Sequence, residues 1–157
     1  MRKMKRGIVV LIALSIMTIS SMPVFAYSSS STVSLPGGSY KVQANVWQSN
    51  TYFWQNHSFA VSAKLYTKSG ATAEATTIKT TWSFSATGVG LSISGVSGAT
   101  GGGNFSGSWT NSNSWISDMS GSFKIGGAPL YSNFNNTAFA LKSGVKAQAT
   151  ASCFRFY

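Results

Sequence analysis

The sequence has few of the residues that carry out chemistry in enzymes. Its 157 residues include two acidic residues, one histidine and one cysteine. A glycosidase needs a pair of carboxylates, and the sole pair here is Glu74 and Asp118. A Ser-His-Asp site would need His57 with Asp118, and no G-x-S-x-G motif identifies a serine. The sequence therefore predicts a protein that is not an enzyme, with His57 in a turn.

The same scarcity bears on metals, cofactors and disulfides. Metal sites need several His, Cys, Asp or Glu side chains close together, and the sequence has no such cluster. The glycine run at 101–103 lacks the Lys-Ser/Thr and the helix of a phosphate-binding loop. We therefore expect no metal and no cofactor. Cys153 is the single cysteine, and its phase with Ala149 and Ala151 predicts a buried residue.

The first 26 residues have the pattern of a helical secretory signal peptide. Four basic residues near the start precede an apolar run over 7–19, and Val24-Phe25-Ala26 forms a small-residue cleavage site before Tyr27. An uncleaved membrane anchor is the alternative, but the run is shorter than the roughly 18 residues that span a bilayer. The predicted organisation is a signal peptide over 1–26 and a single domain over 27–157. We expect the protein to be secreted and extracellular.

The scarcity of acidic residues leaves the predicted secreted domain with eight basic and two acidic residues, a net charge of +6. The basic residues are scattered along the sequence: Lys41, Lys64, Lys68, Lys79, Lys124, Lys142, Lys146 and Arg155. Because nucleic-acid binding favours clustered charge and more arginine, we expect no nucleic-acid partner. A moderate positive field favours anionic partners, such as acidic wall polymers or an anionic membrane surface, although it also serves solubility alone.

Period-two alternation of apolar and polar residues is the main structural signal. It predicts strands over 40–46 and 59–65, each with one buried face. Pro36-Gly37-Gly38 and Lys68-Ser69-Gly70 separate strands as turns or loops. We expect the Ser-rich segment 27–32 to fray. The segment 71–77 is ambiguous, because its alanines favour helix and its threonines favour extended chain.

The clearest alternation lies at 77–94 and predicts a central β-hairpin. Ile78, Trp82 and Phe84 share one phase, and the phase changes after Ala86. A two-residue turn at Thr87-Gly88 would explain the change and place the apolar side chains of both arms on one face.

Two further hairpins are predicted in the second half of the chain. A loop at 111–113 would pair Trp109 with Trp115, and Asn113 would supply its left-handed residue. Asp118 to Gly121 resembles a type I turn. A three-residue loop at 142–144 would pair Leu141 with Val145.

About eight or nine short strands with recurrent turn signals are typical of an all-β protein. We expect an antiparallel β-sandwich, with a closed antiparallel β-barrel as the alternative.

Aromatic residues are the positive functional signal. The chain has five Trp, six Tyr and ten Phe. Tyr52, Phe53 and Trp54 are consecutive, so at least one faces outward if the segment is extended, and Trp109 and Trp115 flank a loop. Exposed aromatics beside polar residues can stack on sugars or lie at a membrane interface. These five residues are the candidate ligand-binding residues.

Two functional classes follow. The first is a non-catalytic binder of cell-envelope or extracellular carbohydrate or anionic polymer. The second is a secreted membrane-active or bacteriocin-like antagonist, for which the segment 78–93 is the candidate membrane hairpin. The residues 131–136, Tyr-Ser-Asn-Phe-Asn-Asn, followed by an alternating strand and an aromatic C-terminus, resemble small secreted bacteriocins of the lactococcin type. That resemblance implies a β-sandwich that acts on cell-wall synthesis in competitors.

Overall fold

A computed structural model describes residues 27–49, 55–87, 91–94, 104–125 and 131–156. These residues form nine β-strands and no helix. Among them, no helix of a length and apolarity that could cross a membrane occurs. The strands are β1 (Tyr27–Ser34), β2 (Tyr40–Gln48), β3 (Asn56–Thr67), β4 (Ala75–Thr87), β5 (Leu91–Ser94), β6 (Asn104–Ser114), β7 (Ile116–Ile125), β8 (Tyr131–Lys142) and β9 (Val145–Phe156).

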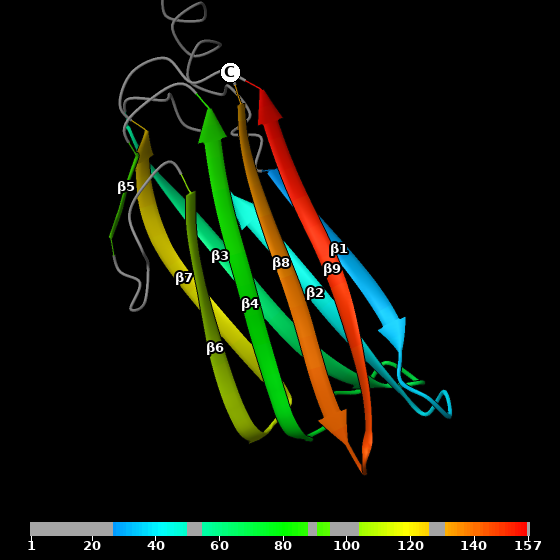
Figure 1. Cartoon of the computed structure of the whole chain (residues 1–157). Coiled ribbons are helices and arrows are strands. Elements are labelled where there is room, and N and C mark those ends of the chain that lie inside the picture. The colour runs from blue at the N-terminus through cyan, green and yellow to red at the C-terminus, as the bar shows by residue number, and fades with distance from the viewer. Residues whose placement is uncertain (1–26, 50–54, 88–90, 95–103, 126–130, 157) are drawn as a thin grey trace, which may run out of the picture.

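The strands form two antiparallel sheets that lie one over the other (Figure 1). The five-stranded sheet has the order β1-β2-β3-β7-β5, and the four-stranded sheet has the order β6-β4-β8-β9. The sheets do not close into one barrel, and this two-layer arrangement is consistent with a β-sandwich. The all-β prediction is therefore confirmed.

The strands predicted over 40–46 and 59–65 are confirmed as β2 and β3, and Val42, Val46, Phe59 and Leu65 all lie in the core. The expected fraying of the Ser-rich start is wrong, because β1 pairs with β2 along its whole length. Backbone pairing does not depend on apolar side chains, and an edge strand with an exposed face tolerates serine.

The predicted central hairpin is wrong, because its two arms do not pair with each other. Ile78, Trp82 and Phe84 are buried as expected, but β4 pairs with β6 on one side and β8 on the other. The next strand, β5, pairs with β7 in the opposite sheet. A strand that crosses to the facing sheet also changes phase, because the direction of the core reverses. The phase change therefore marks a crossing between sheets and not a two-residue turn.

The predicted pairing of Trp109 with Trp115 is wrong for the same reason. Trp109 lies on β6 opposite Thr80, whereas β7 begins directly after Trp115 in the other sheet. Asn113 has a φ of 52°, which confirms the expected left-handed residue, and the Ser114 hydroxyl bonds the backbone of Ile116. The chain thus turns a corner between sheets.

Residues 118–121, predicted as a turn, lie within β7. Their cross-strand partners on β3 are 59–62, so the segment is extended. The turn prediction rested on Asp first and Gly fourth, and this composition also fits a strand with an exposed polar face.

The last hairpin is confirmed, but its register differs by one residue on one side. Lys142 pairs with Val145 around the two-residue turn Ser143-Gly144, whose residues have φ values of 51° and 79°. Two left-handed residues in succession are typical of a type I′ turn. The shorter loop places Ala138 and Ala140 in the core and leaves Leu141 half-buried.

One half of the core is built from closely packed aromatic rings. Phe59 and Phe123 come from the five-stranded sheet, and Trp82, Phe84 and Phe134 from the four-stranded sheet. The ring centroids of Phe84 and Phe123 are 4.5 Å apart, and those of Phe59 and Phe134 are 4.7 Å apart. These contacts across the two layers join the sheets.

The other half of the core contains small and aliphatic residues, among them Ala44, Ala63, Ala138 and Ala140. A polar layer separates the two halves. Its centre is the fully buried Asn136 of β8. The side-chain amide of Asn136 makes hydrogen bonds to Thr80 in its own sheet and to backbone oxygens of the facing sheet.

Candidate functional site

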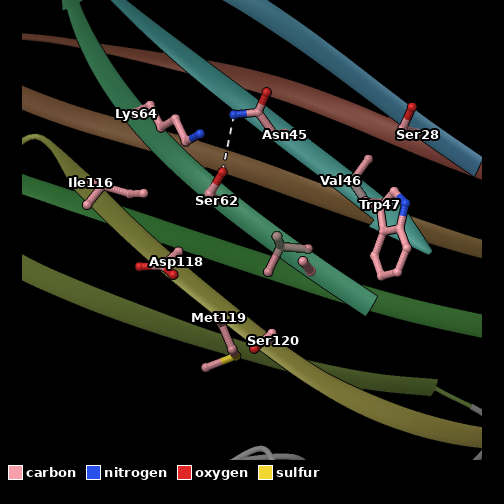
Figure 2. Close-up of a pocket in the computed structure, with 12 residues that line it drawn as sticks. Ser28, Asn45, Val46, Trp47, Ser62, Lys64, Ile116, Asp118, Met119 and Ser120 are labelled. Atoms are coloured by element: carbon pink, nitrogen blue, oxygen red, sulfur yellow. Dashed lines mark hydrogen bonds between the residues drawn. The ribbon is translucent and has the colours of Figure 1, made fainter. Parts of the chain in front are cut away.

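A shallow hollow of about 310 Å³ lies on the outer face of the five-stranded sheet. It runs across β1, β2, β3 and β7, and Figure 2 shows its lining side chains. Its most prominent group is Trp47 of β2, an indole with 37% of its surface exposed. The hollow is therefore an aromatic-bordered surface on a rigid sheet.

The cross-strand register explains why the face of Trp47 remains open. Trp47 lies between Ser28 of β1 and Ala60 of β3, and Ala60 lies opposite Ser120 of β7. Side chains directly opposite on neighbouring strands lie about 5 Å apart at their Cβ atoms. Because these three neighbours are too short to cover the indole, a flat ligand can reach it.

The next row across the sheet supplies hydrogen-bonding groups. Asn45 lies opposite Ser62, and Ser62 lies opposite Asp118. The Asn45 Nδ2 atom donates to the Ser62 hydroxyl at 3.2 Å, and Asp118 is exposed on β7 (Figure 2). An amide, a hydroxyl and a carboxylate thus lie one row from the indole.

A third row places a positive charge at the far end of the hollow. Lys64 lies four residues along β3 from Ala60, which corresponds to about 13 Å at the usual rise of a strand. Its Nζ atom lies 5.9 Å from the ring centroid of Trp115. The backbone oxygen of Trp115 accepts from the amide of Leu65 at 2.9 Å, which holds this tryptophan beside β3.

The buried Asn136 supports the floor of the hollow from the opposite sheet. Its Nδ2 atom donates to the backbone oxygens of Asn45 and Ser62 at 2.8 and 2.9 Å. Its Oδ1 atom accepts from the Thr80 hydroxyl at 2.9 Å. The amide is therefore fixed at both ends, and it holds the two strands whose outer side chains form the polar row.

Of the five residues predicted to bind ligand, Tyr52, Phe53 and Trp54 lie outside the described residues. Trp115 is 39% exposed and does not itself line the hollow, but it lies next to Lys64, which does. Trp109 is 48% exposed but belongs to β6 of the other sheet, where its Nε1 atom donates to Asn111 Oδ1 at 3.0 Å. The structure thus places one of the two described tryptophans beside the hollow.

Trp47 was missed by the sequence analysis, although its signal was present. Val42, Ala44 and Val46 face the core, so alternation alone directs Trp47 outward. The neighbours that leave it open could not be read from the sequence, because Ser28, Ala60 and Ser120 come together only through strand register.

The residues with the most reactive side chains lie in the core. His57 is fully buried on β3 and stacks on Phe123 with ring centroids 4.8 Å apart, so its predicted place in a turn is wrong. Cys153 is buried as predicted. Burial raises the pKa of the Cys153 thiol, and the hydrogen bond from Gln48 Nε2 to its sulfur at 3.3 Å partly opposes that rise.

Among the residues that the structure describes, no group of three or more His, Cys, Asp or Glu side chains could hold a metal ion. The arrangement that remains is a surface of stacking, hydrogen-bonding and cationic groups over the five-stranded sheet. No protein-family model, no curated protein and no solved structure matches the chain.

Proposed function

We propose that this protein is a secreted, non-catalytic binder of cell-envelope or extracellular carbohydrate, and that the hollow over the five-stranded sheet is its binding surface. The observation that carries the proposal is the open face of Trp47 beside a row of polar side chains. Sugar rings have an apolar face and a rim of hydroxyls, so they suit an aromatic platform bordered by hydrogen-bonding groups.

The three rows of the hollow assign a role to each group. The Trp47 indole stacks on one sugar ring. Asn45, Ser62 and Asp118 form hydrogen bonds with the hydroxyls of that ring or the next one. Lys64 lies about 13 Å along the strand, where it meets a further residue of the glycan or an acidic substituent on it. A glycan chain therefore lies along β3 with its stacked end at Trp47.

The surface is suited to binding and not to bond cleavage. Asp118 is the one carboxylate that lines the hollow, whereas hydrolysis of a glycosidic bond normally uses two. The hollow is also open and shallow, and so water is not excluded from it.

The proposal is tested by retention of the protein on purified cell-wall and polysaccharide preparations, followed by titration with soluble fragments of any glycan that retains it. Trp47→Ala should weaken binding by about tenfold or more, because truncation of a central aromatic anchor typically costs about 2 kcal/mol. Asn45→Ala and Lys64→Ala should weaken it less.

Trp109→Ala is the matched control, because it removes a tryptophan that is even more exposed, 48% against 37% for Trp47, from the other sheet. The proposal fails if no preparation retains the protein at low salt, or if the Trp47 and Trp109 variants lose binding equally.

The bacteriocin-like or membrane-active role stays an alternative proposal with less support. Its candidate hairpin needed 78–86 and 89–93 to pair, whereas β4 and β5 lie in different sheets. Trp82 and Phe84 pack against Phe59 and Phe123 in the core. Release of dye from anionic liposomes at micromolar protein would favour this role over the binder.

A further inference from the structure

The lysines that are scattered in the sequence gather at one end of the folded chain. This end carries the turns between β1 and β2, β3 and β4, and β8 and β9, together with the corner between β6 and β7 (Figure 1). We call it the lysine pole. Six of the eight basic residues of the described strands and turns belong to it: Lys41, Lys64, Lys68, Lys79, Lys142 and Lys146.

Three of these lysines reach the pole from the five-stranded sheet. Lys41 lies opposite Ser34, the last residue of β1, and opposite Tyr66 near the end of β3. Lys68 is exposed in the turn after β3, and its backbone amide donates to the oxygen of Ser39 at 2.9 Å. Lys64 lies on β3, four residues before Lys68.

The other three belong to the four-stranded sheet. Lys146 is exposed on β9 opposite Leu141, just after the β8–β9 turn. Lys142, at the start of that turn, donates to the backbone oxygen of Glu74, and its Nζ atom lies 5.3 Å from the ring centroid of Tyr40. Lys79 projects from the outer face of β4, next to Thr80, whose amide bonds Ser117 at the start of β7.

Negative charge within the described residues is sparse at this pole. Glu74 lies there, and Asp118 lies in the hollow above it. The two remaining basic residues lie at the opposite end, where Lys124 faces Asn56 and Arg155 lies over the ring of Tyr27 at 5.4 Å. With six lysines and one glutamate, the pole has a net charge of +5, and the opposite end and the hollow together account for the remaining +1.

We propose that the lysine pole is a second binding site, and that its ligand is a flexible linear polyanion with repeated phosphate or carboxylate groups. All six cations are lysines, which act as point charges and do not impose the bidentate geometry that arginine imposes. The six lysines surround the turns at the lysine pole and extend onto the outer faces of both sheets. A flexible chain can contact lysines on both faces, whereas a flat membrane meets mainly the tip.

This site is separate from the carbohydrate hollow in all but Lys64. Lys68 and Lys146 do not line the hollow, and Trp47 does not belong to the pole. The two sites can therefore be tested independently, and the proposed function and this inference can fail separately.

The test uses inorganic polyphosphate and poly-L-glutamate as probes, with binding to the full domain measured by calorimetry over a series of salt concentrations. Both probes should bind at low salt, and their affinity should fall steeply as salt rises, because bound counterions are released. Lys68→Glu/Lys146→Glu should lower the affinity at low salt by about tenfold or more and reduce the dependence on salt.

The single variant Lys146→Glu is compared with its matched control Lys124→Glu, because each reverses one exposed lysine on a strand. Lys124→Glu should lose less than about a third as much affinity as Lys146→Glu, and Trp47→Ala should keep polyanion binding. Equal losses in the Lys124 and Lys146 variants would show that net charge alone acts, which overturns the site. Binding to anionic phospholipid vesicles without binding to either polymer would overturn it in favour of a membrane surface.

Discussion

Asn136 offers the sharpest test of how the two sheets are joined. It is fully buried on β8, and its side chain bonds the hydroxyl of Thr80 within its own sheet and the backbone oxygens of Asn45 and Ser62 in the facing sheet. We expect Asn136→Ala to destabilise the protein strongly, because it removes at once three hydrogen bonds made by a fully buried side chain.

The magnitude follows from what each partner loses. A buried hydrogen bond contributes about 0.5–1.5 kcal/mol net, so three bonds give about 1.5–4.5 kcal/mol. The two backbone oxygens have a second lone pair that a strand partner can occupy, so they lose part of their hydrogen bonding. Thr80 is fully buried and loses the acceptor of its hydroxyl. We therefore expect a loss of about 2–4 kcal/mol in the free energy of unfolding.

Urea denaturation followed by tryptophan fluorescence measures this loss. Asn135→Ala is the control, since Asn135 is the neighbouring amide but points outward, where its Oδ1 atom accepts from Ser152 at 2.7 Å. It should cost less than about 1 kcal/mol. A double-mutant cycle with Thr80→Val should show a coupling of about 1 kcal/mol between Thr80 and Asn136. If the two asparagine variants are equally stable, the polar layer does not join the sheets.

The remaining predictions concern two glycines and the single thiol. Gly107→Ala would place a Cβ atom 2.9 Å from the indole of Trp82, so we expect a loss of about 1–3 kcal/mol by urea denaturation. Gly144→Ala meets no atom within 4 Å but keeps a φ of +79°, so its loss should be about 1 kcal/mol and purely conformational; a larger loss than in Gly107→Ala would contradict the steric argument. The Cys153 thiol has a raised pKa because it is buried. Because the folded protein favours the neutral thiol, this group contributes its full stabilisation at pH values below the ordinary thiol pKa. The contribution is lost as the pH rises through the raised pKa of the folded state. The stability advantage over Cys153→Ala should shrink in alkaline solution, and an advantage that grows with pH would refute the assignment.

The sequence predicted the strands well where one face alternates cleanly. The residues 40–46 and 59–65 lie within β2 and β3, because apolar side chains at every second position can be buried only by an extended chain. The prediction failed where the chain passes between sheets, after β4 and after β6. A tight turn and a crossing both change the phase, so alternation cannot distinguish them.

The candidate site depended on register, which alternation does not supply. The outward direction of Trp47 could be inferred from its phase, but its open face depends on Ala60 and Ser28, which lie beside it only in the observed pairing. The same holds for the lysines. They are separated by as many as 105 positions in the printed sequence, from Lys41 to Lys146, and become neighbours because four connections meet at one end.

The composition of the core and the cross-sheet hydrogen bonds of Asn136 are physically linked. The core residues beneath the pole include Ala44 and Ala63 in one sheet and Ala138 and Ala140 in the other, whereas the opposite half contains the aromatic rings. Sheets usually lie about 10 Å apart, and small inward side chains allow a closer approach. Replacement of these alanines by larger residues would therefore separate the sheets and disturb the hydrogen bonds that Asn136 makes across them.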